Sequence, residues 1–245
     1  MLYDYFMQVR EVVIQSAERA PKGSLFTPDI ATSAIGQAAV LFIHGYGGDR
    51  SRYAEYAEAV TEELDVTSLT IDLSGHGDSE GDLRTLLPKD HVADATAAYD
   101  FLLDQPTVDP DRMGVVGTSY GGNIAALLCR DRTPKSLLLR APAIFEDIPE
   151  DVTRQASDET GENFRRQLEA TLPANGPLRG IMNVRGLVTV VESEHDDALD
   201  PTAVNSSLAV AAVAKHVVIP GAGHVLKGEE RAMYRDILVD WAAEL

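Results

Sequence analysis

The chain has 245 residues, with 21 basic and 39 acidic side chains, 44% hydrophobic residues and a single cysteine. This length suits one domain with a sizeable core, and the composition is that of a soluble globular protein. The net charge of −18 argues against nucleic acid and against an anionic membrane surface as partners, because both need clustered basic side chains. Such an excess of acids is typical of a well-solvated surface.

The opening stretch MLYDYFMQVREVVIQ shows no basic leader followed by an apolar segment and a cleavage site. No apolar run reaches the ~18 residues that would indicate a membrane span. We therefore expect a soluble, cytoplasmic protein without membrane association. Cys129 has no partner for an internal disulfide, and its neighbours in AALLC predict a small buried thiol.

Short apolar runs alternate with longer amphipathic runs along most of the chain. Before them, VREVVIQS and GSLFTP predict an antiparallel hairpin at one edge of a sheet. The expected strands that follow are 38–43, 66–71, 112–117, 135–142, 186–193 and 215–220. The expected helices are 51–64, capped by Ser51, then 88–105, 120–131, about 201–213 and 229–245. This alternation predicts a single α/β domain over residues 1–245, with a mainly parallel sheet covered on both faces.

Residues 143–180 interrupt the alternation. The stretch is polar and contains short helical patterns such as GENFRRQLEATL. We interpret it as a short cap over a site at the carboxyl ends of the strands. Its arginines could meet an anionic group of a substrate, although pairing with acids of the cap itself is the commoner outcome: Arg154, Arg165, Arg166 and Arg179.

The sequence Gly117-Thr118-Ser119-Tyr120-Gly121 follows the expected strand 112–117 and precedes a helix. This G-x-S-x-G pattern is typical of a sharp turn that holds a serine in a strained conformation and exposes its hydroxyl at the top of a sheet. We therefore predict Ser119 as a nucleophile. The alternative is a tight glycine turn with only a packing role.

A serine hydroxyl needs a base to take its proton. His224 lies in the loop IPGAGHVLKG, just after the last expected strand, where small residues leave its ring room to reach a neighbouring strand end. We predict His224 as this base. The other histidines are expected to be packed or solvated: His44, His76, His91, His195 and His216.

A carboxylate that orients this histidine should follow a strand and precede His224. The run VVESEHDDALDP offers five such acids. The strand must end near Glu192, and a short loop has to turn the acid inward, which favours Asp196. The alternatives are Asp197 and, less favoured, Glu192, Glu194 and Asp200.

Acyl transfer also needs hydrogen-bond donors for the oxyanion that develops on the carbonyl. One donor should be the backbone N–H of Tyr120, which follows the nucleophile. The loop HGYGG after strand 38–43 offers the backbone N–H of Tyr46 as the second. Its glycines let the backbone come close to a substrate, and the alternative is an ordinary glycine turn before a helix.

The motifs HGYGG, DLSGHGDS, GTSYGG, EHDDALDP and GAGH, in this order over about residues 38–245, resemble the α/β-hydrolase superfamily. Within it the chain is similar to small bacterial carboxylesterases and to the catalytic domains of serine aminopeptidases and prolyl oligopeptidases. The segment DLSGHGDS resembles the cinnamoyl and feruloyl esterase branch, where this loop is mostly structural. The chain departs from the resemblance at Ser193, where the acid loop often has glycine.

These motifs predict a serine hydrolase that cleaves small to medium carboxylic esters through an acyl-enzyme and uses neither a cofactor nor a metal. Its expected partner is the small-molecule ester alone. Amide or peptide hydrolysis with the same residues is the alternative within enzymes. A ligand-binding protein on the same fold is the alternative outside them, and a haloalkane dehalogenase is excluded because position 119 is not aspartate.

Overall fold

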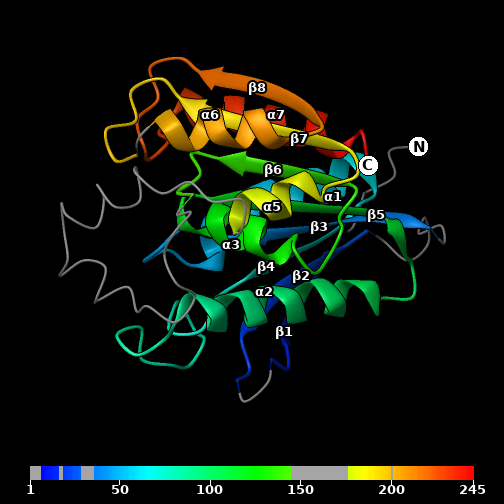
Figure 1. Ribbon diagram of the computed structural model, residues 1–245. Coiled ribbons are helices and arrows are strands. Elements are labelled where there is room, and N and C mark those ends of the chain that lie inside the picture. Colours follow the sequence, from blue (N-terminus) through cyan, green and yellow to red (C-terminus); the bar gives the residue numbers. More distant parts are fainter. Residues whose placement is uncertain (1–6, 17–18, 29–35, 145–175, 200) are drawn as a thin grey trace, which may run out of the picture.

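The computed structural model describes residues 7–16, 19–28, 36–144, 176–199 and 201–245 (Figure 1). Its strands are β1 (Gln8–Val13), β2 (Lys22–Thr27), β3 (Gln37–Ile43), β4 (Thr67–Ile71), β5 (Val108–Thr118), β6 (Ser136–Arg140), β7 (Leu187–Ser193) and β8 (Val213–Ile219). Its helices are the short 3₁₀ helix η1 (Arg50–Tyr53), α1 (Ala54–Leu64), α2 (Pro88–Leu103), α3 (Tyr120–Leu128), α5 (Pro177–Met182), α6 (Pro201–Val210) and α7 (Glu229–Ala242). The expected alternation of strands and helices is confirmed.

The strands form one sheet in the order β1-β2-β4-β3-β5-β6-β7-β8. The predicted hairpin is the antiparallel pair β1–β2, and β2 continues antiparallel beside β4. From β4 to β8 every neighbouring pair is parallel. The carboxyl ends of β3, β5, β6, β7 and β8 therefore meet at one edge of the sheet, which is where the predicted site residues follow their strands.

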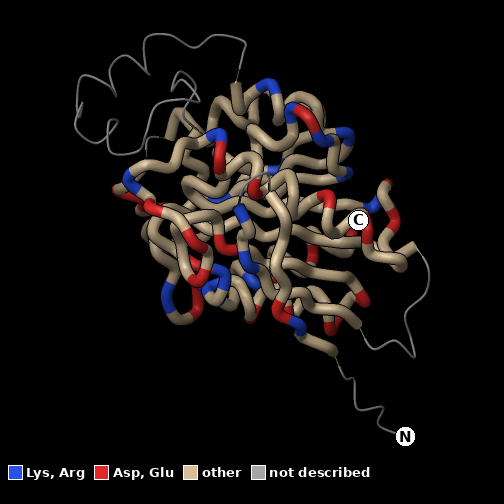
Figure 2. The backbone as a smooth tube through the Cα atoms, turned by 90° about the horizontal axis from the view of Figure 1, so that it is seen from below, with Lys and Arg blue, Asp and Glu red and all other residues tan. Residues whose placement is uncertain are grey.

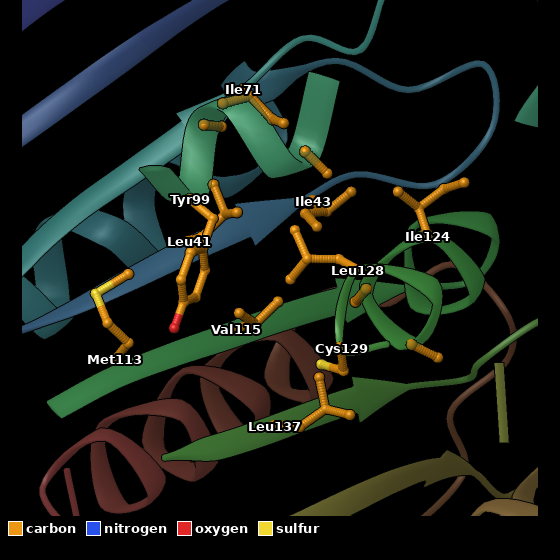
Figure 3. Close-up of a cluster of buried hydrophobic side chains, with 14 of the residues drawn as sticks. Leu41, Ile43, Ile71, Tyr99, Met113, Val115, Ile124, Leu128, Cys129 and Leu137 are labelled. Atoms are coloured by element: carbon orange, nitrogen blue, oxygen red, sulfur yellow. The ribbon is translucent and has the colours of Figure 1, made fainter. Parts of the chain in front are cut away.

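Helices cover both faces of the sheet, as the alternation predicts (Figure 1). In that view α2, α3, α5 and α6 lie in front of the sheet, and α1 and α7 lie behind it. The helices on each face bury a separate apolar cluster against the alternating side chains of the strands. The cluster in front contains Leu41, Val115, Leu137 and Cys129, all fully buried (Figure 3). Cys129 is buried as predicted, and this burial raises the pKa of its thiol.

Several element boundaries differ from those predicted. The first helical segment begins as η1, and the side chain of Asp49, rather than Ser51, caps it by accepting a hydrogen bond from the backbone N–H of Ser51 (2.9 Å). β5 begins earlier than expected, at Val108, because the strand continues through a register shift opposite β3. α6 ends at Val210 and β8 begins at Val213, so the helix ends about three residues earlier and the strand begins two residues earlier than expected.

The end of the predicted cap contains α5, which packs against α3: a Cβ added to Gly180 would lie 1.7 Å from the carbonyl oxygen of Ala126. Ile181 is fully buried in the apolar cluster in front of the sheet. Most of the predicted cap, including Arg154, Arg165 and Arg166, lies outside the described residues, and Arg179 is exposed. Among the helices that the structure describes, none is both long and apolar enough to cross a membrane.

Trp241 anchors α7 against the sheet, and its side chain is 1% exposed. Its ring lies so close to β5 that a Cβ added to Gly114 would come within 2.6 Å of it, and its Nε1–H donates to Ser136 Oγ (2.8 Å). We expect Trp241→Ala to lower the free energy of unfolding by about 3–5 kcal/mol, because the change leaves a cavity behind the sheet. Urea denaturation measures this loss. Met233→Ala, at an exposed position of the same helix, should change it by about 0.5 kcal/mol or less.

Candidate active site

Ser119 lies between β5 and α3 with φ = 54° and ψ = −121°, a backbone conformation that side chains rarely adopt. Two glycines make this turn possible. A Cβ on Gly117 would lie 2.4 Å from the carbonyl oxygen of Gly121, and a Cβ on Gly121 would lie 2.3 Å from the carbonyl oxygen of Ile43. Any side chain at either glycine of the motif would therefore clash with the backbone of this turn. The strained turn leaves the Ser119 side chain only partly buried, next to the loop that follows β3.

The structure brings the three predicted side chains together. His224 Nε2 lies 3.1 Å from Ser119 Oγ, and His224 Nδ1 lies 2.8 Å from Asp196 Oδ2. An ionised carboxylate can only accept hydrogen bonds, so Nδ1–H is the donor to Asp196 and Nε2 is left to accept from the serine hydroxyl. The side chain of Asp196 is 10% exposed and that of His224 is 26% exposed, so water is largely kept from the pair.

Backbone hydrogen bonds join the loop that carries Asp196 to the loop that carries His224. The N–H of His195 donates to the carbonyl oxygen of Ala222 (2.8 Å), and the N–H of Gly221 donates to the Glu194 carboxylate (2.7 Å). Asp196 Oδ1 also accepts from the N–H of Ala198 (3.0 Å). These contacts fix the register of the acid loop and select Asp196, whereas Asp197 is exposed. Asp200 lies outside the described residues.

The remaining acids and histidines of the sequence analysis have other surroundings. Glu192 pairs with His216 (2.7 Å), and His195 is exposed. His44 is buried and accepts a hydrogen bond from the N–H of Leu73 (3.1 Å). His91 is buried between the carbonyl oxygen of Ser74 and the phenol of Tyr120. His44 and His91 thus bind the loops around Ser119, and neither bonds its hydroxyl.

The loop Asp72–Ser79 is structural, as the resemblance implies. The fully buried Asp72 forms an ion pair with Arg50 and accepts from the backbone N–H groups of Arg50 (2.7 Å) and Asp78 (2.9 Å). Arg50 also contacts Glu11 on β1 (2.7 Å). The loop is thereby held between the hairpin and the start of η1, which fixes the position of the β3 loop beside Ser119.

The buried histidines make stability depend on pH. Burial lowers the pKa of His44 to about 3 and that of His91 to about 4, against an ordinary value of 6.5. Both are neutral in the folded protein, whereas the unfolded chain takes up protons below about pH 6.5. Acid therefore favours unfolding, and the free energy of unfolding should fall by about 1 kcal/mol per histidine between about pH 6.5 and 5.5.

Urea denaturation across this pH range measures the effect. His91→Gln should remove part of it, since His44 and His76, whose pKa burial also lowers, are still present. A free energy of unfolding that stays level over this range in the unmodified protein would show that these histidines are not held neutral by the fold.

The two predicted oxyanion donors flank Ser119. Tyr120 is the first residue of α3 and follows the nucleophile directly. Tyr46 follows Gly45, and a Cβ added to Gly45 would lie 3.8 Å from Ser119 Oγ. The rings of Tyr46 and Tyr120 meet edge to face, with centroids 5.8 Å apart. The structure thus places both residues beside the hydroxyl, where their backbone N–H groups remain the predicted donors.

A pocket of about 400 Å³ opens beside Ser119 and His224 on the side of the sheet covered by α1 and α7. We call it the Ser119 pocket. Besides these two residues its walls include Tyr53, Tyr234 and Arg140. Its size lies within the range typical of pockets for small molecules.

Arg140 was not singled out by the sequence analysis, which treated it as part of a strand. It is the last residue of β6, lies in register with Thr118 of β5, and accepts a backbone hydrogen bond from the N–H of Ser119 (3.0 Å). The available signal was a charged residue that directly follows three leucines in a strand that is buried on both faces.

The fold and this site define an α/β-hydrolase: a mostly parallel sheet, a strained serine between a strand and a helix, and acid and histidine on later strand-end loops in the order Ser, Asp, His. The family model described as "Serine aminopeptidase, S33" matches residues 35–176, and the chain belongs to this family of serine hydrolases.

Known proteins resemble the chain in sequence and in structure. An uncharacterised protein of Mycobacterium tuberculosis is 33% identical over 218 residues, which is 88% of this chain and 72% of that protein. The esterase Est1E of Butyrivibrio proteoclasticus, solved with ferulic acid, superposes with a TM-score of 0.75 at 18% identity, covering 95% of this chain and 98% of the other. An acetyl xylan esterase of Paenibacillus sp. R4 superposes with a TM-score of 0.69 at 18% identity, covering 97% and 89%. At this identity the two structures show a shared fold.

Proposed function

We propose that this protein hydrolyses carboxylic esters with small to medium acyl groups through an acyl-enzyme on Ser119. The observation that carries the proposal is the continuous chain of hydrogen bonds from Asp196 through His224 to Ser119 Oγ. The Ser119 pocket beside this chain supplies space for a substrate of that size. The esterases with the same fold support the choice of an ester.

In the proposed reaction Ser119 Oγ attacks the ester carbonyl while His224 Nε2 takes the hydroxyl proton. The backbone N–H groups of Tyr46 and Tyr120 stabilise the oxyanion. As the intermediate collapses, the bond between the carbonyl carbon and the alcohol oxygen breaks, and His224 gives its proton to that oxygen. A water molecule then loses a proton to His224, attacks the acyl-enzyme and releases the acid, and Ser119 recovers its proton. Asp196 holds Nδ1–H throughout.

Amide hydrolysis is a second candidate, and the name of the family favours it. The same residues would serve, with His224 protonating the leaving amine. An aminoacyl p-nitroanilide assayed beside p-nitrophenyl butyrate separates the two: the ester proposal expects turnover of the butyrate and little or none of the anilide. The reverse ranking would replace the ester with an amide.

We expect kcat/KM across p-nitrophenyl esters from acetyl to palmitoyl to peak at an acyl group of about eight carbons or fewer. Each buried CH₂ contributes about 0.8 kcal/mol, so a longer chain gains only where apolar wall remains to cover it. The polar sequence of residues 143–180 offers little such wall. The rate should also show no jump at the solubility limit of the substrate. A profile that peaks at palmitoyl would indicate an apolar tunnel and a lipase.

A further inference from the structure

The Ser119 pocket carries a charge opposite to that of the chain as a whole. Acidic residues outnumber basic ones by 39 to 21 and are spread over many elements of the molecule (Figure 2). Yet three arginines, Arg52, Arg140 and Arg231, lie among the described residues that line the pocket, and no aspartate or glutamate does. Two of them have carboxylate partners outside the lining, Arg231 with Glu55 (2.6 Å) and Arg52 with Asp49 (4.0 Å), which leaves Arg140 as the cation of the pocket to consider.

Arg140 is the innermost of these cations and is 5% exposed. Its Nη2 donates to Ser193 Oγ (2.9 Å) and to the carbonyl oxygen of Gly223 (3.2 Å), which are both neutral acceptors. Its Nε is buried and has no hydrogen-bond partner in the part of the chain that the structure describes, where the guanidinium also pairs with no carboxylate. A buried charge without a counter-ion is costly, so the site gains when an anion enters it.

Two hydroxyl groups beside Arg140 are also unsatisfied. Thr118 Oγ1 and Tyr234 Oη are buried and lie near each other, and neither makes a hydrogen bond of normal geometry among the described residues. Both line the Ser119 pocket. Burial raises the pKa of Tyr53 and of Tyr234, and the positive charge of Arg140, which lines the same pocket, acts in the opposite direction on both. The guanidinium of Arg140 and the hydroxyl groups of Thr118 and Tyr234 are therefore available as hydrogen-bond donors in one pocket.

We propose that the Ser119 pocket binds a carboxylate on the substrate, with Arg140 as the residue that pairs with it and Thr118 and Tyr234 as further donors. The substrate class is then an ester that carries a free carboxylate a few bonds from the scissile carbonyl. This inference rests on the proposed ester hydrolysis for the reaction, but the binding of the anion can be measured without turnover. It also disfavours an aminopeptidase substrate, whose free amine would meet the positive charge of Arg140.

A purely positioning role is the main rival explanation for Arg140. Its contacts with Ser193, at the end of β7, and with Gly223, next to His224, could simply hold the acid and histidine loops in place. Loss of Arg140 would then slow every substrate by the same factor. The tests below therefore compare a charged with a neutral substrate of the same shape.

The first experiment uses the unmodified protein and two matched pairs of esters. Monomethyl glutarate is compared with the methyl ester of glutaramic acid, which puts the carboxylate on the acyl side. 3-Acetoxypropanoate is compared with 3-acetoxypropanamide, which puts it on the alcohol side. In at least one pair kcat/KM should be about tenfold or more higher for the acid, the usual gain from a hydrogen bond to a charged group. An acid that is equal to or poorer than its amide in both pairs would overturn the proposal.

Binding separates this proposal from the proposed reaction. Calorimetry on the Ser119→Ala variant should give, in at least one of the two pairs, a Kd for the acid about tenfold or more below that for its amide. If the unmodified protein hydrolyses none of these esters but this difference appears, the ester reaction fails and the anion site stands. If the esters are hydrolysed and the Kd values are equal in both pairs, the anion site fails and the reaction stands.

Variants then identify the residue. Arg140→Gln should reduce the preference for the acid to about onefold while it changes the neutral ester less, whereas equal losses on both would assign Arg140 a positioning role only. Because that variant can fail to fold, Tyr234→Phe, which removes one unpaired hydroxyl, should lower the preference about threefold or more. Arg231→Gln at the pocket mouth should lower it by a smaller, salt-sensitive factor. Arg235→Gln, one turn further along α7 and outside the pocket lining, is the matched control.

Discussion

Ser119→Ala is expected to fold normally and to lose hydrolysis by about 10⁶-fold in kcat, the loss seen when the nucleophile of such a site is removed. The change deletes the oxygen that lies 3.1 Å from His224 Nε2 and leaves the backbone of the turn in place. Hydrolysis of p-nitrophenyl butyrate measures the loss. Circular dichroism and urea denaturation check that the variant is folded.

Labelling provides an independent readout of the same assignment. A fluorophosphonate should modify the unmodified protein at Ser119 alone, as located by peptide mass spectrometry, and should leave the Ser119→Ala variant unmodified. Ser206→Ala, on α6 and outside the lining of the Ser119 pocket, should keep both labelling and activity. Activity that survives in Ser119→Ala, or labelling at another serine, would show that the nucleophile is elsewhere.

The fold could be predicted because its information is local. Apolar runs of strand length, the glycines around Ser119 and the proline at the start of α2 each act over a few residues, and the structure confirms the elements they indicate. The predicted ends of an element were wrong where a contact with a distant segment of the chain sets them. β5 extends back to Val108 because Gln37 of β3 pairs with Val108. The sequence of residues 108–111 does not predict this pairing.

The residues of the candidate site also fall into those that local sequence predicts and those that depend on contacts between distant segments. Ser119 and His224 could be predicted from their own loops. The choice of Asp196 among five nearby acids rested on the expected strand end and the length of the loop, and it left alternatives open. The deciding contact, from the N–H of His195 to the carbonyl oxygen of Ala222, joins two loops on neighbouring strands. The sequence did not predict Arg140 as a site residue for a related reason. Arg140 reaches the site because it lies beside Thr118, and this position depends on the pairing of β6 with β5.

Asp196→Asn is expected to lower kcat by about 10⁴-fold while the protein remains folded. An amide at this position can donate a hydrogen bond to His224 Nδ1, where the carboxylate only accepts one. The ring would then carry its proton on Nε2, and Nε2 could no longer take the proton of Ser119. The loss should therefore appear in kcat, with KM for p-nitrophenyl butyrate changed by about threefold or less, since the residue does not line the Ser119 pocket.

The neighbouring acid is the matched control for this prediction. Asp197→Asn removes a charge one residue further along the same loop, but Asp197 is exposed, so its kcat should stay within about tenfold of the unmodified value, or about 1.4 kcal/mol in barrier. Glu194→Gln should behave similarly, because a glutamine oxygen can still accept from the N–H of Gly221. If Asp197→Asn were the crippling change and Asp196→Asn the mild one, the hydrogen bond of 2.8 Å between Asp196 and His224 would not be the one that works in the reaction, and the acid loop would have to shift by one residue when substrate binds.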